Sequence, residues 1–259
     1  MHERLSFYVR RDSFLHHLNP LTKLTLAFSF ILIAFGTPFY WTPHLLILFG
    51  IIPLSLIGRV AREYFNAALR LILPAAGFLF IMQALFQPLE GQEVFHIWFL
   101  NPTVESVMFA FGNAARIFVM VSSFTMMLLT THPSELMTDL TRRGLPSQFA
   151  YVIISTLQII PQMQAKAQTI IAAQQSRGLD TESTFMKRAG SVLPLVGPLV
   201  FGSLVEVEER AIAIEARGFT SKKAKTSLHE IPDSRSDQAI RWGLIILVII
   251  SIALNLWPS

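Results

Sequence analysis

Charged residues are missing from long stretches in the first half of the chain, which is the pattern of membrane-spanning helices. Residues 24–58 contain no Asp, Glu, Lys or Arg, and a run of this length exceeds the roughly 20 apolar residues that one span requires. Pro38 and Pro43 lie near its middle and predict a turn there. We therefore expect two short helices, at about 23–37 and 43–58.

Three further apolar stretches predict the other spans, at about 71–89, 104–131 and 242–258. The basic segment 59–70 is expected to connect the second and third spans, and residues 88–105, which contain Glu but no Lys or Arg, to form a loop. The expected fold class is an all-α integral membrane protein with about five transmembrane helices and a cytoplasmic set of amphipathic coupling helices.

The distribution of Lys and Arg predicts the orientation of the chain. With five spans and a cytoplasmic N-terminus, every Lys and Arg except Arg116 falls on the cytoplasmic side or at its boundary. Cytoplasmic loops of membrane proteins carry an excess of these two residue types. We therefore expect a multi-pass protein with its N-terminus in the cytoplasm and its C-terminus outside.

Composition narrows the chemistry that the chain can perform. Only 15% of its residues are charged, against about 25% in typical soluble domains, which indicates a lipid environment. There are no cysteines, so disulfides and thiolate chemistry are excluded, and the seven histidines are scattered without metal-ligand spacing, so no metal site is expected. The phosphate-binding motif Gly-x-x-x-x-Gly-Lys-Ser/Thr is missing. Nucleotide hydrolysis would therefore have to come from a partner, and so apolar a chain is not expected to bind nucleic acid.

Between the fourth and the last span the chain becomes polar and basic, and three amphipathic helices are expected there. The first, 133–143, begins with Pro133 and stops before Gly144, as capping preferences predict. The second and third are expected at about 162–177 and 203–217, each with an apolar stripe at helical spacing. One face of the second helix carries Ile160, Met163, Ala167, Ile170 or Ile171 and the polar Gln174, and the stripe of the third comprises Leu204, Val207, Ala211 and Ile214.

Two charge-free segments, 144–165 and 189–205, complicate the count of spans. If the first crossed the membrane, the basic residues that follow it would be translocated against the charge rule. We therefore place both segments at the cytoplasmic boundary or dipping into the inner leaflet. Pro194, Gly197 and Pro198 favour an interrupted hairpin in the second segment.

The two long polar helices end on the same short motif. Arginine in a last helical turn followed by glycine is ordinary helix capping, and Arg143 before Gly144 repeats the dipeptide elsewhere in the chain. Capping alone and partner docking both fit the pattern, because a glycine can stop a helix and leave the arginine at its end. The motif residues are Ser176, Arg177 and Gly178 in the first helix and Ala216, Arg217 and Gly218 in the second.

These paired ends resemble the two Ala-Arg-Gly motifs of the T component of energy-coupling factor (ECF) transporters. The similarity covers nearly the whole chain. Residues 17–23 (HLNPLTK) resemble the entry to that family's first span, residues 130–136 (TTHPSEL) and 144–146 (GLP) its segment after the fourth span, and residues 209–219 its most characteristic block. Ser176 departs from the family's usual alanine, but serine is also small.

The resemblance implies a scaffold without catalytic residues or cofactor, in the cytoplasmic membrane of a prokaryote. In that family two ABC ATPase subunits, the same or different, bind the ends of the two coupling helices. A separate small membrane protein, the S component, binds the vitamin or metal ion. The T component transmits ATP-driven closure to the S component, which topples in the membrane. The ATPase-docking residues implied here are Ser176, Arg177, Gly178, Ala216, Arg217 and Gly218.

The chain would then comprise a membrane region with four spans (1–131), a coupling region (132–225), and a polar linker with the last span (226–259). Residues 233–237 belong to the expected linker. Arg116 lies in the fourth span, where a charge is costly. It would either make an intramembrane polar contact or snorkel to the inner end of the span.

Two other functions compete with this interpretation. The permease subunit of a conventional ABC importer also docks ATPases, usually through one loop of Glu-Ala-Ala-x-x-x-Gly type. Residues 215–218 do not follow that spacing, and this chain has two helix ends rather than one loop. An integral membrane enzyme would need acidic, His or Ser groups clustered at one membrane depth, and the sequence shows no such cluster.

Overall fold

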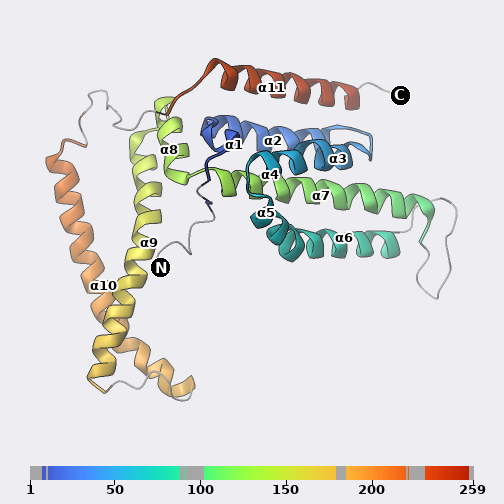
Figure 1. Cartoon of the computed structure of the whole chain (residues 1–259). Helices are drawn as coiled ribbons and strands as arrows, with labels where there is room; N and C mark the ends of the chain where they lie inside the picture. Colours follow the sequence, from blue (N-terminus) through green and yellow to red (C-terminus); the bar gives the residue numbers. More distant parts are fainter. Residues whose placement is uncertain are drawn as a thin grey trace. The chain divides into compact units, whose positions relative to one another are not determined.

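The computed structural model describes residues 8–9, 11–87, 91, 102–178, 185–219, 221 and 231–256, with no side-chain description for 185–194. Every regular element over these residues is a helix (Figure 1), which confirms the all-α fold class. The chain divides into two compact units. One, here called the membrane unit, is formed by Ser6–Gly144 and Ile231–Ser259, and the other contains Leu145–Glu230.

The membrane unit begins with the one-turn helix α1 (Phe14–His17) and helix α2 (Pro20–Gly36). The Asn19 side chain accepts a hydrogen bond from the backbone N–H of Leu21 at 2.9 Å. Pro20 occupies the first helical position, where its missing N–H has no helical partner to lose. The helix of the first expected span, about 23–37, therefore begins three residues earlier, at Pro20.

The second short span is one helical stretch, Thr42–Ile57, built from three consecutive elements. These are α3 (Thr42–Leu45), the π-helical η1 (Leu46–Ile51) and α4 (Ile52–Ile57). The expectation of two short helices separated by a turn is confirmed.

The segment 59–70, expected to be only a connection, is helical from residue 61 onward. Elements α5 (Ala61–Ala67), η2 (Ala68–Ile72) and α6 (Leu73–Phe86) follow one another without a break. The chain turns at Arg59, which has a left-handed φ of 54°. No glycine or proline follows until residue 74, so the helix starts well before the charge-free run.

The two π-helical turns share a cause. Both η1 and η2 lie directly before a helix with proline in its first positions, Pro53 in α4 and Pro74 in α6. Proline has no backbone N–H and crowds the preceding turn. Local π-helical widening lets an apolar helix accommodate the proline while its other backbone groups stay hydrogen-bonded.

Helix α7 (Val104–Thr130) lies at the centre of the membrane unit and matches the expected fourth span. Thr103 caps it, accepting a hydrogen bond from the Ser106 N–H at 3.1 Å. Helix α7 packs against α2 and α6, and α2 also packs against α11 (Arg235–Leu256), so α11, α2, α7 and α6 lie in sequence across the unit (Figure 1). Ile51 of η1, Ile72 of η2 and Val119 of α7 are buried together in one hydrophobic core.

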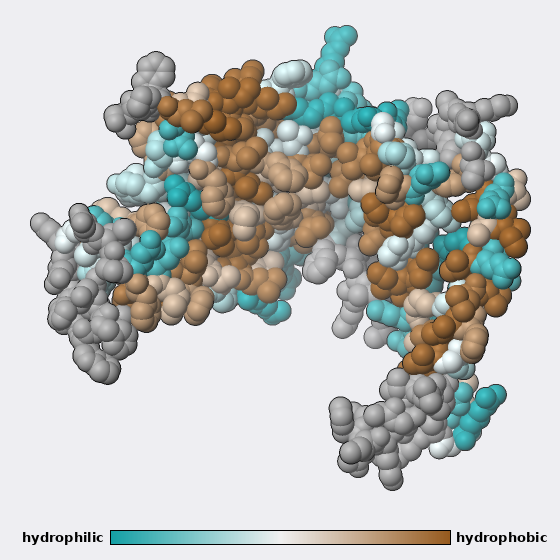
Figure 2. Space-filling model, turned by 180° about the vertical axis from the view of Figure 1, so that it is seen from behind, coloured by the Kyte–Doolittle hydropathy of each residue, from teal (hydrophilic) through white to brown (hydrophobic). Residues whose placement is uncertain are grey.

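The apolar helices account for the five expected spans. Large hydrophobic side chains remain exposed on them, including Phe49 at 73% and Leu71 at 69%, and Figure 2 shows broad hydrophobic surfaces. Most of the expected loop 88–105 lies outside the described residues. Among the described residues, the helices long and apolar enough to cross a membrane are Ala61–Phe86, Val104–Thr130 and Arg235–Leu256, and the shorter apolar ones are Pro20–Gly36 and Thr42–Ile57.

The segment 233–237 is not a linker, because it starts α11 and ties it to α2. The Ser234 N–H donates to Asp237 Oδ2 and the Asp237 N–H donates to Ser234 Oγ, both at 3.2 Å, which is a capping-box arrangement. The other oxygen of the Asp237 carboxylate accepts a hydrogen bond from the Asn19 N–H at 3.1 Å. These polar residues therefore start a helix and hold it in place.

The unit that contains Leu145–Glu230 is built on two long helices, α9 (Ser147–Ser176) and α10 (Phe185–Ala216). The charge-free segments 144–165 and 189–205 were expected to be separate from the two polar helices, with a hairpin in the second segment. Instead, α9 continues through Pro161 and α10 continues without a break past residue 205. The interrupted hairpin was therefore wrong. A proline removes one helical hydrogen bond, whereas a turn in an apolar segment would leave several backbone groups without partners.

Candidate functional site

The end of α9 is set by a glycine in a conformation that other residues disfavour. Gly178 has φ +89°, and its N–H donates to Gln175 O at 2.9 Å, which closes the last turn. No heavy atom lies within 4 Å of a Cβ added there, so the backbone angle and not crowding selects glycine. Ser176 and Arg177, just before it, are exposed.

The end of α10 has the same construction in more complete form. Gly218 has φ +72°, its N–H donates to Glu215 O at 2.9 Å, and the Phe219 N–H donates to Ile214 O at 3.1 Å. This pair of bonds defines the Schellman motif. Ala216 and Arg217 are exposed, so the motif stops the helix and leaves the guanidinium in solvent.

At the third Arg-Gly end, which follows helix α8 (Pro133–Arg142), the arginine is bound by side chains of its own chain. Gly144 again has a positive φ, +113°. Here, however, the arginine is engaged: Arg143 Nε donates to Asp139 Oδ2 at 3.3 Å and Nη2 donates to Asp233 Oδ2 at 2.8 Å. The same dipeptide therefore fixes α8 within the membrane unit.

In the described part of the chain, neither Arg177 nor Arg217 has such a partner. Within the described residues, neither side chain forms an ion pair or a hydrogen bond. Both are exposed at the end of a long helix. An arginine keeps its charge at physiological pH and binds carboxylates through two parallel hydrogen bonds. These two ends therefore present unused anion-binding groups.

Helices α9 and α10 run antiparallel. Arg210 Nη2 donates to Gln162 Oε1 at 3.4 Å, and Ser203 Oγ approaches Met163 Sδ at 3.3 Å. Further along α9, Ile170 and Leu199 line the same small cavity of about 110 Å³. Rising residue numbers in α9 thus meet falling numbers in α10, as Figure 1 also shows.

An ion pair joins the middle of the two helices. Lys166 Nζ donates to a carboxylate oxygen of Glu206, and Arg210 approaches the other oxygen at 3.6 Å. The hydrogen bond from Lys166 is the main reason that the pKa of Glu206 lies below its usual value. The carboxylate therefore stays charged at neutral pH and pairs the helices in one register.

The antiparallel arrangement places the two arginine ends far apart. The ring of Phe219, just after Gly218, lies 5.1 Å from that of Tyr151, near the start of α9. Arg177 lies 26 residues further along α9, which corresponds to about 39 Å at the α-helical rise. The structure therefore does not bring the two sets of motif residues together, but puts one at each end of the helix pair.

The apolar stripe expected on α10 faces away from α9. Leu204 is 61% exposed and Val207 59%, whereas Ser203, Glu206 and Arg210 contact α9. In α9 the expected stripe does face the partner helix, through Met163, Ala167 and Ile170 among others. Helix α10 thus keeps an apolar surface without a partner in the described part of the chain.

Arg116 lies against the C-terminal end of α2. Its Nε donates to Ala34 O at 3.1 Å and its Nη1 to Asn113 Oδ1 at 2.9 Å, while Nη2 lies 3.5 Å from Thr37 O. The last carbonyls of a helix have no helical donor. Helix α2 is only 17 residues long, about 26 Å, which is shorter than the hydrocarbon core of a bilayer. Its C-terminal end would therefore lie inside the membrane, and the Arg116 guanidinium donates to carbonyl groups there.

Sequence reasoning missed the polar cluster that holds α2, α8 and α11 together. Besides Asp237, it includes Asp139, whose Oδ1 lies 3.4 Å from Asn19 Nδ2, and Asp233, which accepts from Arg241 at 2.8 Å. The sequence feature that could have indicated this cluster is the set of acidic residues close to apolar spans, because buried charges need partners. Among the described residues, no group of three His, Cys, Asp or Glu side chains could hold a metal ion.

Comparisons with known proteins assign the chain to a family. Residues 11–228 match the model of the family CbiQ, described as cobalt transport protein. The chain is 27% identical to the energy-coupling factor transporter transmembrane protein EcfT of Lactococcus lactis subsp. cremoris, over 97% of this chain and 96% of that one. It is 29% identical to EcfT of Bacillus subtilis and 30% identical to EcfT of Exiguobacterium sibiricum, each over 93% of both chains.

The matches extend over both units, from the first span through both arginine-bearing helix ends. They agree with the all-helical fold and with the apolar helices of the membrane unit. The chain therefore belongs to the CbiQ family and is the membrane-embedded T component of a bacterial energy-coupling factor transporter.

Proposed function

We propose that this chain is the scaffold that couples two ABC ATPases to a separate substrate-binding membrane subunit. ATP-driven movement of the ATPases would be transmitted through α9 and α10 to the small S component, which carries a vitamin or a metal ion into the cell. The chain itself would catalyse no reaction. This proposal takes its partners from the resemblance and its contact points from the two helix ends.

The observation that carries the proposal is the contrast among the three Arg-Gly ends. Arg143 is bound to two carboxylates of its own chain, whereas Arg177 and Arg217 are exposed and unpaired among the described residues. The positive φ angle explains the glycine at all three ends, but it does not explain why two of the preceding arginines are exposed to solvent. A carboxylate on each of two partners would supply what these side chains lack.

The geometry of the pair suits two partners rather than one. Ends about 39 Å apart leave room for one ATPase on each. Because an ion pair between Lys166 and Glu206 joins the helices, a change in the distance between the two ATPases would be expected to move both of them. The exposed apolar surface of α10, with Phe201 at 71% and Leu204 at 61%, would be the contact for the S component.

Purification in mild detergent tests this proposal directly. An affinity-tagged copy of the chain should retain two ATPase subunits and a small hydrophobic protein, and the last would identify the substrate. A conventional ABC permease would instead retain a second permease subunit and no small substrate-binding membrane protein, which would favour the alternative function.

The proposed orientation has its own test. Because the chain has no cysteine, a Gly91→Cys variant carries one reactive thiol in the segment expected outside. A membrane-impermeant maleimide added to intact cells should label it, and pre-treatment with a second impermeant thiol reagent should block the labelling. Labelling only after the membrane is opened would reverse the proposed topology.

A further inference from the structure

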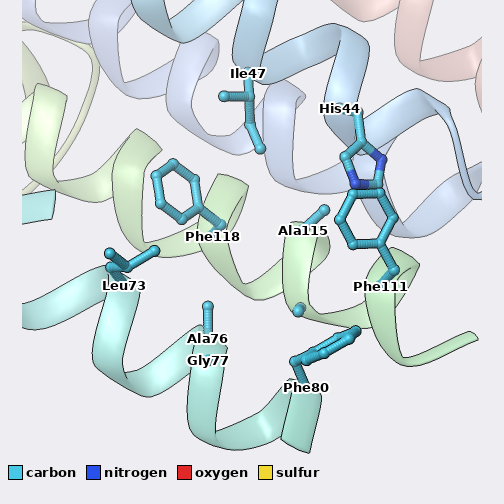
Figure 3. A pocket seen from close by; sticks show the side chains of 10 residues that line it. His44, Ile47, Leu73, Ala76, Gly77, Phe80, Phe111, Ala115 and Phe118 are labelled. Atoms are coloured by element: carbon cyan, nitrogen blue, oxygen red, sulfur yellow. The ribbon is translucent and has the colours of Figure 1, made fainter. Parts of the chain in front are cut away.

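Two neighbouring apolar pockets in the membrane unit share part of their lining, and together they are here called the groove. The first, of about 360 Å³, lies between α3, η1, α6 and α7, and the second, of about 320 Å³, continues it toward α5. Both are lined by Ile47, Leu73 and Phe118. Figure 3 shows Ile47 and Phe118 above Leu73 and, at the other end, the ring of His44 against that of Phe111.

The groove has the length and the lining of a site for a hydrocarbon chain. From Leu69 to Phe80 it follows 11 residues of helix, about 16 Å, close to the roughly 15 Å of one leaflet's hydrocarbon layer. Leu69 is 66% exposed and Leu73 52%, so the groove opens on the surface that faces lipid. His44 and Phe111, stacked at 4.2 Å, line its far end.

Two exposed arginines lie at the other end of the groove. Asn66 lines the groove there, and Arg62 and Arg70 stand four residues before and after it, on the same side of the helix. Both arginines are exposed, and neither has an ion pair within the described residues. The acidic neighbour, Glu63, is already paired with Arg11 at 3.1 Å.

We infer that this groove binds an anionic phospholipid of the inner leaflet, with an acyl chain along α6 and the phosphate between Arg62 and Arg70. The lining offers an acyl chain apolar contact along its length, and two guanidinium groups match a phosphodiester. A polar solute would find few partners inside the groove. This site is independent of the coupling function, and its assignment to the inner leaflet rests on the proposed orientation of the chain.

Native mass spectrometry of the full chain, released from vesicles with equal phosphatidylglycerol and phosphatidylethanolamine, tests the site. The wild-type chain should retain phosphatidylglycerol preferentially. The double variant Arg62→Ala, Arg70→Ala should reduce that preference about tenfold or more, because each basic residue near the surface adds to anionic-lipid binding. Arg235→Ala, at another exposed arginine, is the matched control and should behave as wild type.

A second variant tests the groove rather than the charge. A Cβ on Gly77 would meet no heavy atom within 4 Å, so Gly77→Phe should fold and fill the groove, and should lose one tightly retained lipid of either kind. Gly243, equally open on α11, provides the control Gly243→Phe. Unchanged lipid retention in both the arginine variant and Gly77→Phe would overturn the proposal.

The occupant can also be identified in the membrane. A Gly77→Cys variant with a photoreactive label, placed in vesicles or in cells, should cross-link to lipid. Cross-linking to a protein subunit instead would show that the groove is a protein interface and would overturn the lipid assignment, whatever the outcome for the coupling function.

Discussion

Replacing both Arg177 and Arg217 with glutamate is expected to abolish uptake by the transporter and to release its ATPases. Each substitution would remove a charge-assisted contact with a partner carboxylate. The introduced glutamate would then face that carboxylate with the same charge. Truncating one member of such a pair costs about 2–5 kcal/mol of binding free energy, so one substitution should weaken ATPase retention by about 30-fold or more and two should remove it. Uptake of the substrate and co-purification of the ATPases in detergent measure the two effects.

The control for this pair is Arg235→Glu, which reverses an exposed arginine in the first turn of α11. Glutamate is well tolerated at a helix N-terminus, so this variant should insert, bind ATPases and transport normally. Arg143→Glu should behave differently from both, because it breaks contacts inside the membrane unit and should lower the amount of folded protein. Normal uptake in the Arg177→Glu, Arg217→Glu double variant would contradict the docking proposal.

Asp237→Ala is expected to lower the free energy of unfolding of the membrane unit by about 3 kcal/mol. The Asp237 side chain is buried and accepts hydrogen bonds from the Asn19 N–H at 3.1 Å and from Ser234 Oγ at 2.7 Å. Removing it leaves buried donors without an acceptor, and hydrogen bonds to a charged group are worth about 1.5–3 kcal/mol each. The midpoint of thermal unfolding in detergent should fall by roughly 6–12 °C.

Asp237→Asn keeps one acceptor oxygen and should lose less than the alanine variant. Gln238→Ala changes the next residue, whose side chain is exposed, and should leave the midpoint unchanged. A midpoint for Asp237→Ala within 1 °C of wild type, roughly the precision expected of such a comparison, would show that this carboxylate does not hold α11 to α2.

Much of the fold could be predicted because its signals are local. A charge-free run of about 20 residues predicts a span wherever it occurs, and Asn19 followed by Pro20 predicts a helix start. The errors also have local causes. Charged residues in 59–70 and prolines in 189–205 were interpreted as breaks, whereas α5 tolerates the charges and α10 continues through its prolines.

The residues of the candidate site could be found from the sequence, but the sequence could not show which of the arginines are paired within the chain. The repeated Arg-Gly dipeptide predicted three helix ends, and all three glycines have positive φ. Which arginines are free could not be predicted, because Arg143 is occupied by Asp233, 90 residues away. Arg116 posed the same difficulty, since two of its acceptors, Ala34 O and Thr37 O, lie at the C-terminal end of another helix.

The sequence by itself determined that this is an all-helical membrane protein, where its helices end, and that two of its long helices end on a small residue followed by Arg-Gly. Hydrophobic run length and backbone conformation decide these properties within a few residues of chain. Only the tertiary structure decided that Arg177 and Arg217 have no ion-pair partner among the described residues while Arg143 is bound, and that the two arginine ends lie at opposite ends of one antiparallel pair. Those properties depend on which distant side chains meet, and spacing along the chain does not encode that.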